Sequence, residues 1–83
     1  MKIPNEIHQR KEFLVLLKDI RQQNGVRQVE LAKQLGVPQS FVSKYETGER
    51  RLDILELWQI CHLIGISLDD FIHQLEEKLN ETE

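Results

Sequence analysis

The chain of 83 residues is 40% apolar and 30% charged, which is typical of one small globular domain rather than of a disordered segment. Its only cysteine is Cys61, so an internal disulfide and a cysteine-rich zinc site are both excluded. No apolar run approaches the roughly 18 residues that a membrane span requires. No apolar signal core opens the chain either, and we therefore expect a cytoplasmic protein.

The net charge of −3 conceals a strong asymmetry along the chain. Residues 1–51 hold ten Lys and Arg against six Asp and Glu, or +4, whereas residues 52–83 hold one Lys against eight Asp and Glu, or −7. The first part thus has the positive charge that binding to phosphates needs. An acidic surface that merely keeps the second part in solution would give the same asymmetry, so charge alone does not decide the function.

The first predicted helix spans about residues 6–23. Asn5 is a suitable N-cap, and Asn24 with Gly25 ends the helix. Val15 and Leu16 lie off the main apolar stripe and suggest a second contact, with the C-terminal part of the chain or with a partner. The stripe itself recurs at steps of three and four residues: Phe13, Leu14, Leu17 and Ile20.

Two short helices are predicted next, over residues 28–35 and 39–47. Gly36 ends the first of them, because glycine adopts a positive φ at low cost. Pro38 is expected at the first position of the second helix, where its fixed φ fits, and Gly48 ends that helix. The second helix should bury Val42 with either Tyr45 or Phe41.

The last two helices are expected over about residues 53–64 and from Ser67 to about Leu79. Asp53 is a possible N-cap of the first, and Gly65 ends it. Residues 67–70, Ser-Leu-Asp-Asp, resemble a capping box, with Ile66 and Phe71 as the flanking apolar pair.

The pattern as a whole predicts an all-α domain of five helices. We expect one domain over residues 1–83, with a core over 6–72. Residues 73–83 should form the end of the last helix and a frayed tail.

Residues 28–47 have the spacing of a helix-turn-helix. Such a unit needs two short helices that cross closely over a tight turn. Ala32 is small enough for the crossing, Gly36 suits the turn, and Val42 supplies the branched side chain that the second helix buries. The outward positions of the second helix are polar, and glutamine and lysine are able to hydrogen-bond adenine and guanine edges. These positions are Gln39, Ser40, Ser43, Lys44 and Thr47.

From about residue 13 to 72 the chain resembles the lambda-repressor-like family, of the Cro/cI or XRE type. The family pattern Q-x-x-L-A-x-x-x-G-x-x-x-x-x-V-S-x-x-E-x-G is matched by Gln28, Leu31, Ala32, Gly36, Val42, Ser43, Glu46 and Gly48. The order of five helices and the later apolar pattern from Leu57 to Phe71 agree as well. The resemblance implies a compact five-helix fold that binds double-stranded DNA through its helix-turn-helix.

The resemblance also implies roles for particular residues. It makes Gln39, Ser40 and Lys44 the base-reading set, with Ser43 as the next candidate. The residues expected to contact phosphates are Gln28, Arg27, Arg50 and Arg51. Arg21 and Glu46 match a pair that forms a partly buried salt bridge in relatives.

The sequence departs from the family pattern at two places. Val37 and Pro38 replace the Ser or Thr cap that is common before the second helix of the motif. Phe41 puts an aromatic ring at a position that is often polar, and contact with a thymine methyl is an alternative there to a place in the core. Both departures bear on the sequence preference more than on the existence of the site.

A row of apolar residues near the end of the chain suggests a dimer. Leu68, Ile72, Leu75 and Leu79 recur at helical steps, which is typical either of core contact with the first helix or of a dimer seam. Leu75 and Leu79 are expected beyond the five-helix core, which favours the seam. Family members read two-fold operators, with half-sites about 34 Å apart. We therefore expect a homodimer interface of Trp58, Ile72, Leu75 and Leu79, although Trp58 could instead be half-buried core.

Other classes of function find little support. His8, His62 and His73 lie singly on separate segments, so we expect no metal site, and no catalytic triad or phosphate-binding glycine loop is visible. The expectation is a DNA-binding regulator of a bacterium or phage, without a cofactor and without enzymatic activity. The alternative is a protein-interaction module, or an antitoxin-type protein that binds a partner through the same fold.

Overall fold

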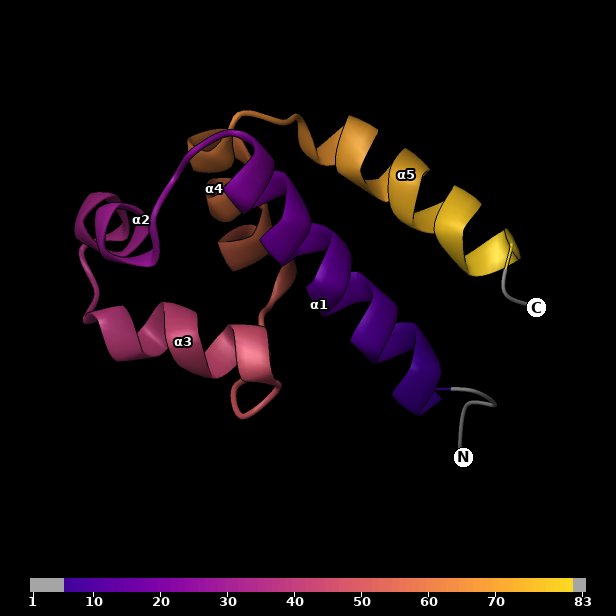
Figure 1. Cartoon of the computed structure of the whole chain (residues 1–83), viewed down its shortest axis with the longest axis horizontal. Coiled ribbons are helices and arrows are strands. Elements are labelled where there is room, and N and C mark those ends of the chain that lie inside the picture. Colours follow the sequence, from indigo (N-terminus) through magenta and orange to yellow (C-terminus); the bar gives the residue numbers. More distant parts are fainter. Residues whose placement is uncertain (1–5, 82–83) are drawn as a thin grey trace.

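The computed structural model describes residues 6–81, which form five α-helices and no strand (Figure 1). The all-α prediction is confirmed. The last helix continues to Glu81 instead of ending at about Leu79, while the expected N-cap Asn5 and the last two residues of the tail lie outside the described part. The helices are α1 Glu6–Gln23, α2 Gln28–Leu35, α3 Gln39–Thr47, α4 Ile54–Ile64 and α5 Leu68–Glu81.

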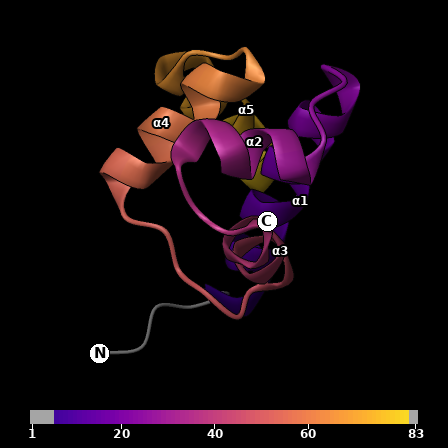
Figure 2. The same ribbon diagram turned by 90° about the vertical axis from the view of Figure 1, so that its left-hand side faces the viewer.

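The helices form two groups about a shared core. α5 runs back along α1 on one side of the molecule, and α2 and α3 lie on the other side (Figure 1). α4 contacts α1, α2 and α5. α2 is seen end-on in Figure 1 and α3 end-on in Figure 2, so the two short helices cross steeply, as a helix-turn-helix requires.

Every helix supplies at least one fully buried apolar side chain to this core. Burying such a side chain contributes roughly 1.5–3 kcal/mol, so the core fixes how all five helices lie. Tyr45 is also buried, on the same face of α3 as Val42. The fully buried residues, one from each helix in chain order, are Leu17, Leu31, Val42, Ile60 and Phe71.

The contact between α1 and α5 is mainly apolar. The rings of Phe13 and Phe71 meet edge to face with their centroids 5.8 Å apart. Leu75 packs against the core of its own chain, so the expectation that it lies beyond that core is wrong. Of the two residues off the stripe of α1, Leu16 packs against the core and Val15 remains 37% exposed.

The helix ends follow from local chemistry. Gly36 has φ 74°, and its N–H donates to carbonyls of the last turn of α2, which closes the turn of the motif. Asp53 caps α4, because its carboxylate accepts from the Glu56 N–H at 2.7 Å while the Glu56 carboxylate accepts from the Asp53 N–H at 2.9 Å. Pro38 is the N-cap of α3 with ψ 152°, one position before the expected one. Proline has no side-chain acceptor, so the N–H groups of this helix end receive no side-chain cap from it.

α5 begins at a Ser cap, in which the Ser67 hydroxyl accepts from the Asp70 N–H at 3.0 Å. The ends of α1 and α4 are tied together, since the Asn24 side-chain amide donates to the Ile64 carbonyl at 2.6 Å. None of the described helices combines the length and apolar character needed to cross a membrane.

Candidate nucleic-acid interface

The side of α3 that faces away from the core is polar and open to solvent. Gln39, Ser40, Lys44 and Thr47 are exposed, and Ser43 is half-buried. No ion pair joins Lys44 to any residue in the described range 6–81. The row therefore presents amide, hydroxyl and ammonium groups that a groove of DNA could receive.

A buried ion pair fixes α3 to α1. Arg21 donates through Nε to Glu46 Oε2 at 2.7 Å and through Nη2 to Glu46 Oε1 at 3.1 Å. The two side chains are only 7% and 3% exposed. Arg21 also donates from Nη1 to the Val26 carbonyl at 2.7 Å, so all three nitrogens of its guanidinium are used. This two-point geometry is what a buried pair needs to offset the loss of hydration.

A chain of amides connects this ion pair to the solvent face of α3. Gln28, at the start of α2, donates to Glu46 Oε1 at 2.8 Å. Gln39, at the start of α3, donates in turn to Gln28 Oε1 at the longer distance of 3.5 Å. Three helices thus share one polar network, and its outer end lies at the first turn of α3. The two glutamines lie together, as the family resemblance implies.

Arg50 is engaged within the chain. Its guanidinium donates to both carboxylate oxygens of Glu56, at 2.8 and 3.2 Å, and to the Arg51 carbonyl at 2.8 Å. It also lies 4.1 Å from the centre of the Phe41 ring, as a cation over an aromatic face. The hydrogen bond from Arg50 and a backbone hydrogen bond from Asp53 lower the pKa of Glu56.

Of the two alternatives for Phe41, the structure supports a place against the core rather than contact with a thymine methyl. Its ring packs against the core, meets Tyr45 edge to face at 6.2 Å and is covered by Arg50. Phe41 therefore braces the loop after α3. The sequence could not distinguish the two positions, because the residue that covers the ring comes from that loop.

The other two arginines of the expected phosphate set are exposed. Arg51 forms no ion pair with a described residue. Arg27 precedes α2 and pairs with Glu30 at 2.9 Å, which lowers the pKa of that carboxyl. An exposed pair of this kind is weak and exchanges easily for a phosphate.

Two buried groups lie behind this face and do not reach it. The Tyr45 hydroxyl has no hydrogen-bond partner in the described structure, and its burial raises the pKa of the phenol. Burial also raises the pKa of the Cys61 thiol to about 11. Among residues 6–81 no three His, Cys, Asp or Glu side chains gather as metal ligands would.

The expected dimer residues do not form one free surface. Trp58 is 54% and Ile72 40% exposed, whereas Leu75 and Leu79 are half-buried. Sequence reasoning missed Ile54 and Leu55, which are exposed on α4 beside Trp58. They lie four and three residues before Trp58, a helical spacing that could have found them. The ring of Trp58 stacks on His62 with centroids 6.2 Å apart.

Comparison with known proteins places these features in a family. Residues 17–71 match the model of a helix-turn-helix family. A solved structure described as an XRE-family like protein from Pseudomonas syringae pv. tomato str. DC3000 is also similar, with 42% sequence identity and a TM-score of 0.81. That similarity covers 86% of this chain and 87% of the other. No curated protein matches the chain.

The fold and the crossed pair α2–α3 define a helix-turn-helix protein. More specifically, the chain belongs to the XRE-type, lambda-repressor-like helix-turn-helix family, which is a family of DNA-binding transcription regulators. The family match leaves out the first part of α1, residues 6–16, and the last part of α5, residues 72–81. The resemblance stated from the sequence is confirmed.

Proposed function

We propose that the chain is a transcription regulator, a repressor or autoregulator, that binds a palindromic operator as a homodimer with α3 in the major groove. The observation that carries this proposal is the polar network behind α3. It links the buried Arg21–Glu46 pair through Gln28 to Gln39, at the helix end that presents its side chains to solvent. A recognition helix has to be held in one orientation for its side chains to meet base edges, and this network holds it.

Base reading falls to the exposed side chains of α3. Gln39 has an amide that is able to bond an adenine edge on two sides, and Lys44 is able to donate to guanine. Ser40 is equally exposed, and the half-buried Ser43 reaches either a base or a phosphate. These four residues are the proposed specificity set.

Phosphate binding falls to groups at the edges of the same face. Gln28 and Arg27 lie at the start of α2, and Arg51 lies in the loop after α3. Arg50 has a different proposed role: its contacts with Glu56 and Phe41 hold the loop that carries Arg51. Contacts with phosphates fix the position on the duplex but carry no base preference.

The proposed dimer contact centres on α4 rather than on the end of α5. Ile54, Leu55 and Trp58 are 60%, 69% and 54% exposed and belong to one helix face. A second copy is the proposed occupant, because a two-fold operator needs two recognition helices about 34 Å apart. Ile72, also exposed, is the most accessible part of the α5 row, while Leu75 packs against the core of its own chain and Leu79 is half-buried.

Selection from a pool of random duplexes tests the reading of DNA. We expect the wild type to enrich a palindrome, and Lys44→Ala to lose about 1–3 kcal/mol of discrimination at one base position of each half-site. Arg51→Ala should weaken binding to every duplex alike. A wild-type pool without any enriched sequence would contradict the proposal and favour a protein-interaction module.

Sedimentation tests the dimer. Leu55→Glu should shift the protein towards monomer and weaken binding to a palindrome more than binding to a single half-site. For the sedimentation measurement Ile7→Glu is the matched control, since Ile7 is 85% exposed on α1, away from α4. A dimer that tolerates Leu55→Glu as well as Ile7→Glu would place the interface elsewhere.

A further inference from the structure

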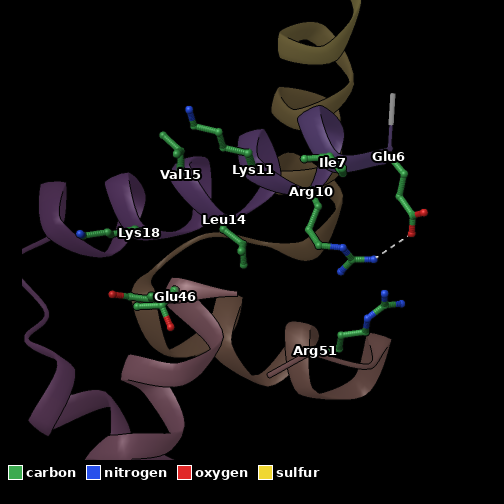
Figure 3. Close-up of a pocket in the computed structure, with 10 residues that line it drawn as sticks. Glu6, Ile7, Arg10, Lys11, Leu14, Val15, Lys18, Glu46 and Arg51 are labelled. Atoms are coloured by element: carbon green, nitrogen blue, oxygen red, sulfur yellow. Dashed lines mark hydrogen bonds and ion pairs between the residues drawn. The ribbon is translucent and has the colours of Figure 1, made fainter. Parts of the chain in front are cut away.

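A groove of about 530 Å³ lies between α1 and the end of α3 (Figure 3). Basic residues dominate its charged lining: Arg10, Lys11 and Lys18 come from α1, and Arg51 comes from the loop after α3. Thr47, the last residue of α3, also lines it. The groove therefore begins where the proposed recognition helix ends.

The positive charge of the groove is little compensated. Glu46 lines it but is already bound to Arg21 and Gln28, and its side chain is 3% exposed. Glu6 pairs with Arg10 at 3.4 Å, and both of these side chains are more than a third exposed, which makes the pair weak. Of the acidic groups that line the groove, only the Glu6 carboxylate is thus available to balance the four cationic side chains.

The side chains of Arg10 and Arg51 approach each other across the groove. Arg10 extends from α1 and Arg51 from the opposite wall, with the two guanidinium groups directed into the same space (Figure 3). Two like charges in one groove repel each other, and an anion placed between them would be attracted to both. Guanidinium groups suit a phosphate in particular, because their N–H groups donate in pairs to its oxygens.

The position of the groove indicates the source of a phosphate that would bind there. Phosphates border the major groove, and the end of a helix lying in that groove comes close to them. We propose that Arg10 and Arg51 together bind one backbone phosphate of duplex DNA at the edge of the half-site that α3 reads. This inference rests on the proposed function. Arg10 precedes residues 17–71, so the contact comes from a part of α1 outside the family match.

The salt dependence of binding to a mixed-sequence duplex tests the proposal without knowledge of the operator. Each phosphate contact contributes about 0.9 to the slope of log K against log salt. We expect Arg10→Ala, in which Arg51 remains at the phosphate, to make the slope shallower by a part of that amount between about 50 and 200 mM salt, and the double replacement of Arg10 and Arg51 by alanine to remove all of it. Lys33→Ala is the matched control, because it removes one cation from an exposed position of α2 outside the groove. An unchanged slope in Arg10→Ala, or an equal change in Lys33→Ala, would overturn the proposal.

A second measurement locates the contact. On a duplex selected by the wild type, single phosphates flanking the half-site are replaced in turn by uncharged methylphosphonates. One replacement should weaken the wild type at least as much as Arg10→Ala does, should have a smaller effect on that variant, and should have no further effect on the double variant that lacks Arg10 and Arg51. Additive losses at every position would contradict a direct contact, as would a groove that prefers an acidic peptide to DNA.

The outcomes separate this proposal from the function on which it rests. If the wild type shows no sequence preference but Arg10→Ala still flattens its slope, the proposed function fails and the phosphate site stands. If the wild type selects a palindrome and Arg10→Ala keeps the full slope, the proposed function stands and the site fails. Thermal unfolding of Arg10→Ala should match the wild type, which shows that the folded state is intact.

Discussion

Two of the helices that contact α1, α3 and α5, are held to it mainly by different kinds of contact. At its C-terminal end, α1 holds α3 through charge, in the buried Arg21–Glu46 pair. Farther back it holds α5 mainly through apolar packing, in the edge-to-face contact of Phe13 with Phe71. Packing tolerates shapes of similar volume, whereas a buried ion pair tolerates only partners with matching donors and acceptors. α3, the proposed recognition helix, is thus held by the contact that tolerates fewer substitutions.

The largest effect should follow from breaking the polar contact on one side. Glu46→Ala leaves the Arg21 charge buried without a counter-charge and should cost about 3–5 kcal/mol of unfolding free energy. Urea denaturation measures this loss. The double replacement Arg21→Met with Glu46→Leu removes both charges and should restore much of the stability, but not the DNA affinity. A double variant as unstable as Glu46→Ala would show that packing, not charge, dominates this site.

The apolar contact should respond more mildly to a change of shape. Phe71→Leu keeps a large apolar side chain in the core and should cost no more than about 1.5 kcal/mol. Denaturation midpoints measure the loss, and affinity for DNA at equal folded fraction should stay unchanged. A loss as large as that of Glu46→Ala would erase the contrast between the two contacts.

The half-exposed ion pair Arg50–Glu56 should contribute less to the free energy of unfolding than the buried ion pair or the apolar contact. Glu56→Gln should cost less than about 1 kcal/mol at neutral pH. The pKa of Glu56 is lowered in the folded state from its ordinary 4.5, so the stabilisation is present above that value and lost as the pH falls through the folded pKa. The difference between wild type and variant should therefore vanish in acid, in denaturation curves recorded at several pH values. A difference that persists there would have another cause.

The smallest effect should come from Tyr45. Its buried hydroxyl has no hydrogen-bond partner in the described structure, so Tyr45→Phe removes an unsatisfied polar group and keeps the ring. The expected change is nil or a slight gain in stability, by thermal unfolding. A clear loss would reveal a hydrogen bond to this hydroxyl in solution.

Local signals sufficed for most of the fold, because they act over a few residues. Glycine at the ends of α2, α3 and α4 and the caps of α4 and α5 set most of the helix limits closely. The end of α5 was less well predicted, since nothing after Leu79 marks a stop. The buried position of Leu75 depends on how α5 lies on α1, which spacing along one helix does not determine.

The sequence predicted most residues of the candidate site, but not all of the contacts that these side chains make within the chain. The family pattern brought together Arg21 with Glu46 and Gln28 with Gln39, which the structure places in one network. It gave no sign that Arg50 is engaged by Glu56 and Phe41, nor that Arg10 faces Arg51. Those contacts join segments whose approach only the folded chain defines.

The burial of Cys61 has a practical consequence. It is the only cysteine in the sequence, it has no exposed surface, and its thiol has a pKa of about 11. A thiol reagent at neutral pH therefore reaches a reactive thiolate only when the domain opens. The rate of labelling therefore depends on how often the domain opens. Slower labelling in the presence of DNA would measure how much the bound duplex stabilises the five-helix fold.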